Sequence, residues 1–166
     1  NVDARNNDGC TPLHTAGTVE AASLLLDRGA NVDARNNDGC TPLHVVRNLS
    51  TARLLLDRRA SLEATDKHDK TPLHNACSKD NLEVASFLLS RGAELEATNN
   101  MGWRPLHYAV LNNCPRVFRL LLDRRAVVDS TTLARTTPLS FACQKGHVEM
   151  VWLLVSRCPW LADRQA

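Results

Sequence analysis

The sequence predicts an all-α solenoid of stacked helix–turn–helix repeats that are joined by extended hairpin loops. Two observations predict this fold. A Thr-Pro-Leu-His segment begins at residue 11 and returns, with changes, after 30, 30, 33 and 33 residues, at positions 41, 71, 104 and 137. A second, apolar ladder keeps step with the first, at residues 24–26, 54–56, 87–89, 120–122 and 153–155. Two ladders in register indicate one structural unit that is copied along the chain.

Each Thr-Pro pair predicts the start of a short helix. The threonine hydroxyl can accept a hydrogen bond from a free amide of the first turn. Proline fits the first helical position because its missing N–H has no intrahelical partner there. The histidine three residues after the threonine can bond back to it, as in a capping box. In the third repeat these signals predict a helix over residues 72–78.

A second helix is predicted after each first helix, for example over residues 82–90. It is apolar around much of its circumference, so we expect neighbouring repeats to bury it on several sides. Gly29 and Gly92 suit a left-handed cap at its end, and Pro115 suits its first position in the fourth repeat. The turn between the two helices is predicted at residues that tolerate a left-handed backbone, namely Asp80-Asn81, Asn112-Asn113 and Gly146-His147.

These motifs resemble the ankyrin repeat, whose usual unit has about 33 residues and a Thr-Pro-Leu-His-x-Ala segment. The resemblance covers the whole chain of 166 residues as a single domain. Residues 1–10 resemble the end of a preceding hairpin, and five repeats follow at 11–40, 41–70, 71–103, 104–136 and 137–166. The resemblance implies an ankyrin-type solenoid that binds another protein, although the family binds many unrelated partners.

Departures from the family pattern predict local differences. The first two repeats lack three residues between the Thr-Pro-Leu-His segment and the apolar ladder, so their first helix and turn should be shorter. Glycine is replaced at the second-helix cap by Arg59, Arg125 and Cys158, each costing roughly 1 kcal/mol where the backbone stays left-handed. Arg104 removes a threonine cap, at a cost of about 1 kcal/mol, and Ser140 removes a histidine. The C-terminal repeats are therefore expected to be locally less stable.

Composition and charge argue against several functions. A formal net charge of +2 gives little support for a basic stripe that would bind nucleic acid. The chain has no run of 18 or more apolar residues, so we expect no membrane insertion. It begins at Asn1 without a leader segment and ends within a repeat. We expect it to be part of a longer protein and to be a monomer.

The repeat separates the residues that could otherwise form a metal site. Equivalent residues of neighbouring repeats lie roughly 10 Å apart if helix packing sets the distance, whereas zinc holds each ligand at about 2 Å. We therefore expect no metal, no cofactor and a structural role for the repeated histidines, which are His14, His44, His74 and His107.

The six cysteines do not suggest a disulfide framework, since they contain no close pair. Cys10 and Cys40 hold equivalent places in successive hairpins, too far apart for a disulfide that spans at most about 7 Å between Cα atoms. Cys77 and Cys143 are expected in the core. The other two, Cys114 and Cys158, lie near turns, where reactivity stays an open alternative. Reduced thiols indicate an intracellular protein, cytoplasmic or nuclear.

Charged residues also recur with the repeat. A catalytic pair needs two close carboxylates in different environments, and the chain has no glycine-rich phosphate loop, so we expect no enzyme. One hairpin position is acidic in all five repeats, at Asp3, Asp33, Glu63, Glu96 and Asp129. The end of the second helix carries Arg28, Arg58, Arg91, Arg124 and Arg157. These arginines are expected to interact with the helix C-terminal dipole, and a basic ridge for an acidic partner or phosphate is the alternative.

The resemblance places partner contacts on the hairpin tips and on the exposed side of the first helices. The predicted partner-binding residues are Lys67, His68, Lys70, Lys79, Asn100, Met101, Trp103, Leu111, Asn112 and Leu133. Interfaces draw much of their energy from buried aromatic anchors, so one hypothesis makes Trp103 an anchor, with the nearby cations contacting acidic groups. The alternative is that Trp103 covers its own hairpin. Trp152 and Trp160 are better explained by capping or by contact with sequence beyond this chain.

The leading functional prediction is a module that recruits or inhibits a partner protein by reversible docking on its concave face, without chemistry. The alternative is a structural or regulatory segment of a larger signalling, channel or effector protein. An enzyme or metal protein is opposed by the regular spacing of the candidate residues.

Overall fold

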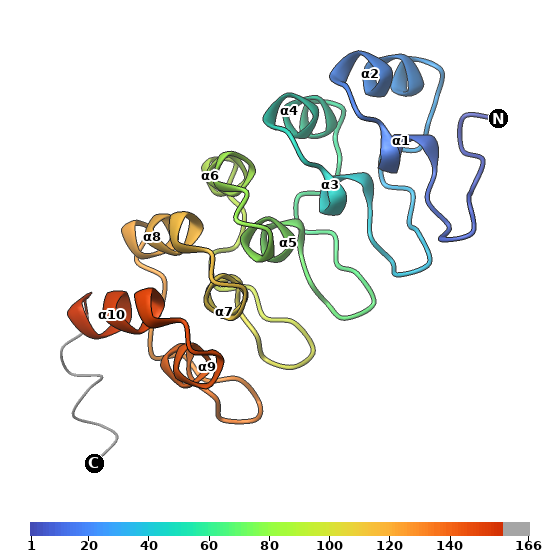
Figure 1. Cartoon of the computed structure of the whole chain (residues 1–166). Helices are drawn as coiled ribbons and strands as arrows, with labels where there is room; N and C mark the ends of the chain where they lie inside the picture. Colours follow the sequence, from blue (N-terminus) through green and yellow to red (C-terminus); the bar gives the residue numbers. More distant parts are fainter. Residues whose placement is uncertain (158–166) are drawn as a thin grey trace.

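The computed structural model describes residues 1–157, which form five helix pairs stacked side by side (Figure 1). The first helices of the pairs make an inner row of α1 (Pro12–Thr15), α3 (Pro42–Val45), α5 (Pro72–Ser78), α7 (Pro105–Leu111) and α9 (Pro138–Lys145). The second helices make an outer row of α2 (Val19–Asp27), α4 (Leu49–Asp57), α6 (Leu82–Ser90), α8 (Pro115–Asp123) and α10 (Val148–Arg157). The predicted all-α solenoid is confirmed.

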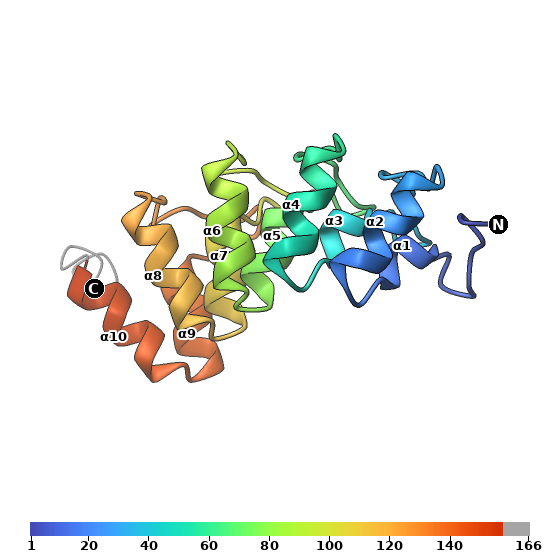
Figure 2. The ribbon, with the colours of Figure 1, turned by 90° about the horizontal axis from the view of Figure 1, so that it is seen from above.

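Five extended loops, which we call hairpins 1 to 5, project from one side of the stack, and the outer helices lie on the other side (Figure 1). The hairpins comprise residues 1–10, 31–40, 61–70, 94–103 and 127–136. In the inner row each helix packs on the next, as in α3 on α5 and α5 on α7, and in the outer row the same holds from α2 to α8. Figure 2, seen from above, shows the same order from α1 and α2 at one end to α9 and α10 at the other. None of the described helices has both the length and the hydropathy that a membrane crossing requires.

The core lies between the two rows, and its residues also form ladders. One ladder comes from the inner row, where the leucine of each Thr-Pro-Leu segment is at most 7% exposed, at Leu13, Leu43, Leu73, Leu106 and Leu139. Another comes from the outer row, where Ala22, Ala52 and Ala85 are fully buried. In the fourth repeat the same position holds Phe118, also 0% exposed. The core of that repeat is therefore filled by a ring instead of a methyl group.

The Thr-Pro starts of the inner helices have the predicted capping geometry. In the third repeat the Thr71 N–H donates to Nδ1 of His74 at 3.1 Å, and the Thr71 hydroxyl lies 2.9 Å from the same nitrogen. Arg104 loses the hydroxyl contact but keeps the backbone bond, from its N–H to Nδ1 of His107 at 3.0 Å. In the fifth repeat Thr137 and Ser140 pair through their hydroxyl groups at 2.9 Å. In the fourth repeat, where threonine is absent, the backbone hydrogen bond of the cap therefore remains and only the hydroxyl contact is lost.

Left-handed residues lie at the predicted turns between the helices of a pair, with φ of 50° at Asp80, 53° at Asn113 and 69° at Gly146. The residues that follow the C-caps of α2, α4, α6 and α8 are left-handed as well, whether or not glycine is present. Gly29 has a φ of 84°, and Arg59 keeps a φ of 67° without glycine. The predicted strain at this arginine is therefore present in the fold.

We expect Arg59→Gly and Arg125→Gly each to stabilise the protein by about 0.5–1 kcal/mol, because arginine in the left-handed region is strained. Arg125 has a φ of 65°. Urea unfolding followed by circular dichroism would measure the change in free energy. The matched reverse change is Gly29→Ala, where a Cβ would meet no atom within 4 Å, so that only backbone strain is added. A stabilising Gly29→Ala would contradict this explanation.

The first two repeats are shortened where the sequence predicts. Helices α1 and α3 have 4 residues each, whereas α5 has 7 and α9 has 8. The lost residues are the last turn of the inner helix. The inner row is therefore thinner at the helix-turn side of repeats one and two.

Candidate protein-docking surface

The tips of the five hairpins are joined into one continuous edge by backbone hydrogen bonds. The Asn37 N–H donates to the Asp8 carbonyl at 2.9 Å, and the same bond recurs from Lys67 to Asp38 at 3.0 Å. Further along, Asn100 donates to His68 at 3.1 Å and Leu133 to Met101 at 3.0 Å. We call this edge the tip ridge. Because each tip is tied to its neighbours, the backbones of the tips keep fixed positions relative to one another.

A polar side chain also closes each hairpin from inside. The Asn99 Oδ1 accepts from the N–H groups of Met101 at 3.0 Å and Trp103 at 2.8 Å. Asn6, Asn36 and Asp66 play the same part in hairpins 1 to 3. These positions recur with the repeat and could have been recognised as turn-forming Asn and Asp residues.

Five of the ten predicted partner-binding residues lie on the tip ridge and are exposed, namely Lys67, His68, Asn100, Met101 and Leu133. Met101 is 55% exposed and Leu133 is 77% exposed, and the bond between their backbones places them on adjacent tips. Large apolar side chains rarely face water together on a protein without a binding role. The ridge therefore changes along its length, from polar hairpins to a cationic tip and then an apolar pair.

Lys70 lies at the base of hairpin 3 instead of its tip. Its ammonium is 3.4 Å from the Asp66 carboxylate, which is only 2% exposed. Burial alone would raise the pKa of Asp66, but the N–H groups of Lys70 and His68 and the Lys70 charge together lower it. Lys70 thus neutralises a buried carboxylate of its own hairpin.

Trp103 is half-buried at the base of hairpin 4, where it packs among other rings. Its centroid is 4.7 Å from Phe141 of the fifth repeat, and 5.3 Å from Tyr108 and 6.4 Å from His107 of the fourth repeat. Its carbonyl accepts from Nε2 of His74 at 3.1 Å. The ring therefore contacts both the fourth and the fifth repeat. Sequence reasoning missed the contact with Phe141 because the equivalent residues of the first three repeats are not aromatic.

The remaining predicted residues lie at the opposite ends of the inner helices from the hairpins. Lys79 is exposed at the end of α5, and Leu111 is half-buried at the end of α7. Asn112 is exposed, and its Nδ2 donates to the Tyr108 carbonyl at 3.0 Å and the Ser78 hydroxyl at 3.2 Å. A seven-residue helix spans about 10 Å. The structure thus divides the ten residues among the tip ridge, the hairpin bases and the helix ends.

Each repeated histidine links its inner helix to the hairpin that follows. Nε2 of His14 lies 2.9 Å from the Cys40 carbonyl, and Nε2 of His44 lies 2.9 Å from the Lys70 carbonyl. A carbonyl can only accept, so Nε2 carries the proton and Nδ1 is left to accept from the capping N–H. Burial lowers the pKa of both histidines. Within residues 1–157 no group of three His, Cys, Asp or Glu residues is placed to hold a metal ion.

The acidic position of each hairpin links it to the next one. The Asp33 carboxylate accepts from the Ser61 N–H at 3.0 Å, and Glu63 accepts from the Glu94 N–H at 3.0 Å. Glu96 does the same for Val127 at 2.9 Å. This ladder fixes the spacing of the hairpins.

Two of the arginines at the ends of the outer helices pair with aspartates of the preceding repeat. Arg58 lies 2.8 Å from Asp27, and Arg91 lies 3.4 Å from Asp57. Both pairs are exposed, so each contributes little to stability. The helix dipole is therefore not the only interaction that these arginines make. Their Asp partners also reduce the positive charge that a basic ridge would present. The Arg157 side chain, Cys158 and Trp160 lie outside the described residues, and Trp152 is 66% exposed on α10.

One cysteine prediction is wrong. Cys77 is fully buried, as expected, but Cys143 is exposed. Both follow alanine in an inner helix, yet α7 covers this face of α5, whereas no described helix packs on the equivalent face of α9. Cys114 is 3% exposed, and burial raises the pKa of its thiol and of the Cys77 thiol. These two thiols are shielded from reagents.

We expect Cys143 to react with a thiol reagent faster than the buried cysteines by at least tenfold, because the thiolate must be both formed and reached. A Cys158→Ser protein treated with iodoacetamide under native conditions, followed by peptide mass spectrometry, would measure the order of labelling. Labelling in urea supplies the control, since unfolding should equalise the rates. Faster native labelling of Cys77 than of Cys143 would contradict the described packing.

Comparison with protein-family models agrees with this geometry. Ankyrin repeats (3 copies) match over residues 1–66 and 45–132, and a further ankyrin repeat matches over residues 135–164. No curated protein matches the chain. The matched ranges cover most of the sequence and contain all five helix pairs. The chain therefore belongs to the ankyrin repeat family.

Proposed function

We propose that this protein binds a partner protein reversibly, on a surface that joins the tip ridge to the exposed ends of the inner helices. Ankyrin repeats are in general protein–protein interaction modules, and proteins of this kind are typically not enzymes. The observation that carries the proposal is the exposed apolar pair Met101 and Leu133, on hairpins whose tips are tied together.

The composition of the ridge supports a partner with an apolar patch beside acidic groups. Met101 and Leu133 offer adaptable apolar surface, and Lys67 and His68 lie exposed on the neighbouring tip. Charged residues next to an apolar centre steer the encounter and select partners more than they add affinity. In this proposal Trp103 supports the ridge through its ring contacts and contributes its exposed edge.

We also infer that the protein works as a monomer in a reducing, intracellular compartment. Its described cysteines are free thiols at separate levels of the stack. Reducing compartments keep such thiols unpaired.

We expect the double variant Met101→Ser, Leu133→Ser to weaken partner binding by about 10- to 100-fold, since truncating central interface residues commonly costs 1–3 kcal/mol. Affinity capture with the unmodified chain would identify the partner, and calorimetry with the purified partner would compare affinities. The matched control is Leu24→Ser, a 56% exposed leucine on the outer helix α2. Equal loss of affinity in both variants, or in neither, would count against the tip ridge.

A further inference from the structure

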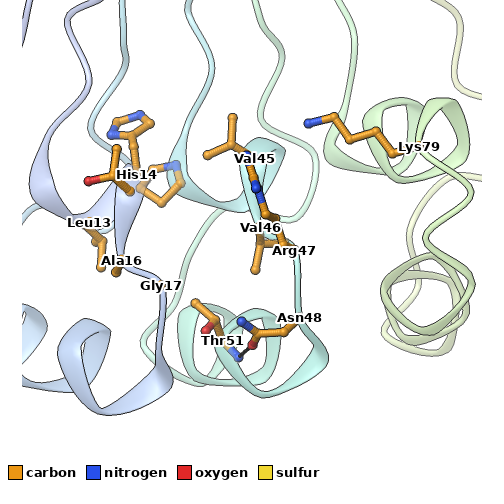
Figure 3. Close-up of a pocket in the computed structure, with 12 residues that line it drawn as sticks. Leu13, His14, Ala16, Gly17, Val45, Val46, Arg47, Asn48, Thr51 and Lys79 are labelled. Carbon is orange, nitrogen blue, oxygen red and sulfur yellow. Dashed lines mark hydrogen bonds between the residues drawn. The ribbon is translucent and has the colours of Figure 1, made fainter.

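A pocket of about 400 Å³ lies at the helix-turn side of repeats one and two (Figure 3). It occupies the space left by the missing last turn of α1 and α3. Lys79, the C-cap of the full-length α5, reaches toward the pocket from the third repeat. Its volume falls within the range of sites that bind ligands. We call this pocket the notch.

The notch has an apolar floor and a polar side. Leu13 and Val46 belong to or pack on the hydrophobic core, and both line the notch. Asn48 and Thr51, at the start of α4, form the polar side. Figure 3 shows these two residues together, across the space from His14.

Among residues 1–157, the hydroxyl of Thr51 has no hydrogen-bond partner. Thr51 is 4% exposed, and its Oγ1 is buried without a hydrogen bond. A threonine within a helix commonly bonds to the carbonyl four residues earlier, but the Arg47 carbonyl instead accepts from Nδ2 of Asn81 at 3.0 Å. An unsatisfied buried hydroxyl is unfavourable and rare in native proteins. Because Thr51 lines the notch, rotation of its side chain about χ1 would turn the hydroxyl toward the notch, where a ligand atom could satisfy it.

Charge identifies the kind of ligand. Arg47 and Lys79 line the notch, both are exposed, and neither pairs with a carboxylate among residues 1–157. No Asp or Glu lines the notch. The nine-residue helix α4 begins there, capped by Asn48, and its N-terminus adds partial positive charge. The notch therefore combines an apolar floor, two unpaired cations and an unused hydroxyl.

We propose that the notch binds an acidic–apolar peptide segment of the docked partner, an inference that rests on the proposed function. An aliphatic side chain of the peptide packs on Leu13 and Val46, and a carboxylate beside it pairs with Arg47 and Lys79. A polar atom of the peptide bonds to the Thr51 hydroxyl. Lys79 lies in the helix-end part of the proposed docking surface, so one partner can reach both the notch and the surface.

The direct test uses a fluorescein-labelled peptide, Gly-Ser-Glu-Leu-Asp-Ile-Glu-Gly, titrated into the 166-residue chain by fluorescence polarisation. We expect saturable binding that weakens at least tenfold when Gln and Asn replace the acids, or when Ser replaces Leu and Ile. Raising the salt concentration should weaken it further. No saturation, or equal binding of all three peptides, would overturn the proposal. Equal affinity for N-acetyl-leucine would also overturn it, by assigning the notch to small carboxylates.

Three variants separate a binding role from a structural one. Arg47→Glu should weaken binding of the acidic peptide at least tenfold. Arg28→Glu, at the exposed C-cap of α2, should leave this binding unchanged. Thr51→Val keeps the shape but removes the unpaired hydroxyl, so it should weaken binding about fivefold while raising or preserving the urea midpoint. A Thr51→Val protein that binds the peptide as well as the unmodified chain would overturn the role of the hydroxyl.

A final comparison distinguishes failure of the notch from failure of the docking function. If the tip variants weaken binding of the captured partner but Arg47→Glu and Ala16→Phe, which fills the notch, do not, the notch inference is wrong and the tip ridge stands. If the notch variants alone weaken it, the tip ridge is wrong. We expect both sets to weaken binding of the partner, and only the notch set to weaken binding of the peptide.

Discussion

Lowering the pH from 7 to 5 is expected to reduce the free energy of unfolding by roughly 3 kcal/mol, mainly through two buried histidines. His74 and His107 are both 0% exposed, and burial lowers the pKa of each to about 4. Each uses both ring nitrogens, with Nδ1 accepting from a capping N–H and Nε2 donating to the next hairpin. Protonating Nδ1 would place its new N–H against the capping backbone N–H, and the hydrogen bond between them would be lost.

The sign follows from the lowered pKa values. Histidine in the unfolded chain keeps a pKa near 6.5, so the unfolded state binds more protons than the folded state between pH 6.5 and 4. The stability contributed by neutral His74 and His107 is fully present above pH 6.5 and is lost as the pH falls toward 4. Asp66, whose pKa is lowered, would add a loss only at more acidic pH.

Urea unfolding at pH 7, 6 and 5, followed by circular dichroism, would measure this dependence. The double variant His74→Gln, His107→Gln should be less stable at pH 7 because the bonds from each inner helix to the following hairpin are weakened. Its stability should also depend less steeply on pH, since it lacks the two groups that take up protons on unfolding. If the free energy of unfolding depended on pH equally in the variant and in the unmodified protein, groups other than His74 and His107 would be responsible for the loss of stability.

Phe118→Ala is expected to destabilise the protein by about 3–5 kcal/mol, the usual cost of truncating a buried phenylalanine. Phe118 is 0% exposed on α8, which packs on both α6 and α7. Repeats one to three hold alanine at this position, but the surrounding side chains of repeat four are arranged around a ring. A cavity would therefore form where those repeats have none, and the loss is a large share of a typical domain stability of 5–15 kcal/mol.

The control for this variant is Leu24→Ala, a large apolar residue of the outer row that is 56% exposed. Its effect should stay within about 0.5 kcal/mol, as for surface substitutions generally. Because each repeat contacts only its neighbours, Phe118→Ala should also uncouple the ends of the array and broaden the urea transition. A loss below 1 kcal/mol for Phe118→Ala would show that repeat four closes around alanine as the first three do.

The features that recur with each step along the stack could be predicted from residues that lie close together in the chain. Thr71, Pro72 and His74 predicted the start and cap of an inner helix because capping depends on residues three apart in one chain segment. The left-handed turns at Asp80 and Asn113 followed from residue type for the same local reason. The separation of equivalent histidines and cysteines followed from the repeat length, and this separation is the reason why no shared metal centre was expected.

Contacts between residues at non-equivalent positions depend on how neighbouring repeats pack, and no local sequence pattern predicted them. Trp103 meets Phe141, and Cys143 faces solvent while Cys77 does not, because these outcomes depend on what the adjacent repeat places on each face. The shortened inner helices were visible in the sequence, but the pocket beside Thr51 depends on how α4 and α5 stand around the gap. A periodic sequence encodes the repeated helix pair and the distance between repeats. Pockets and contacts between repeats depend on how the side chains of neighbouring repeats pack together.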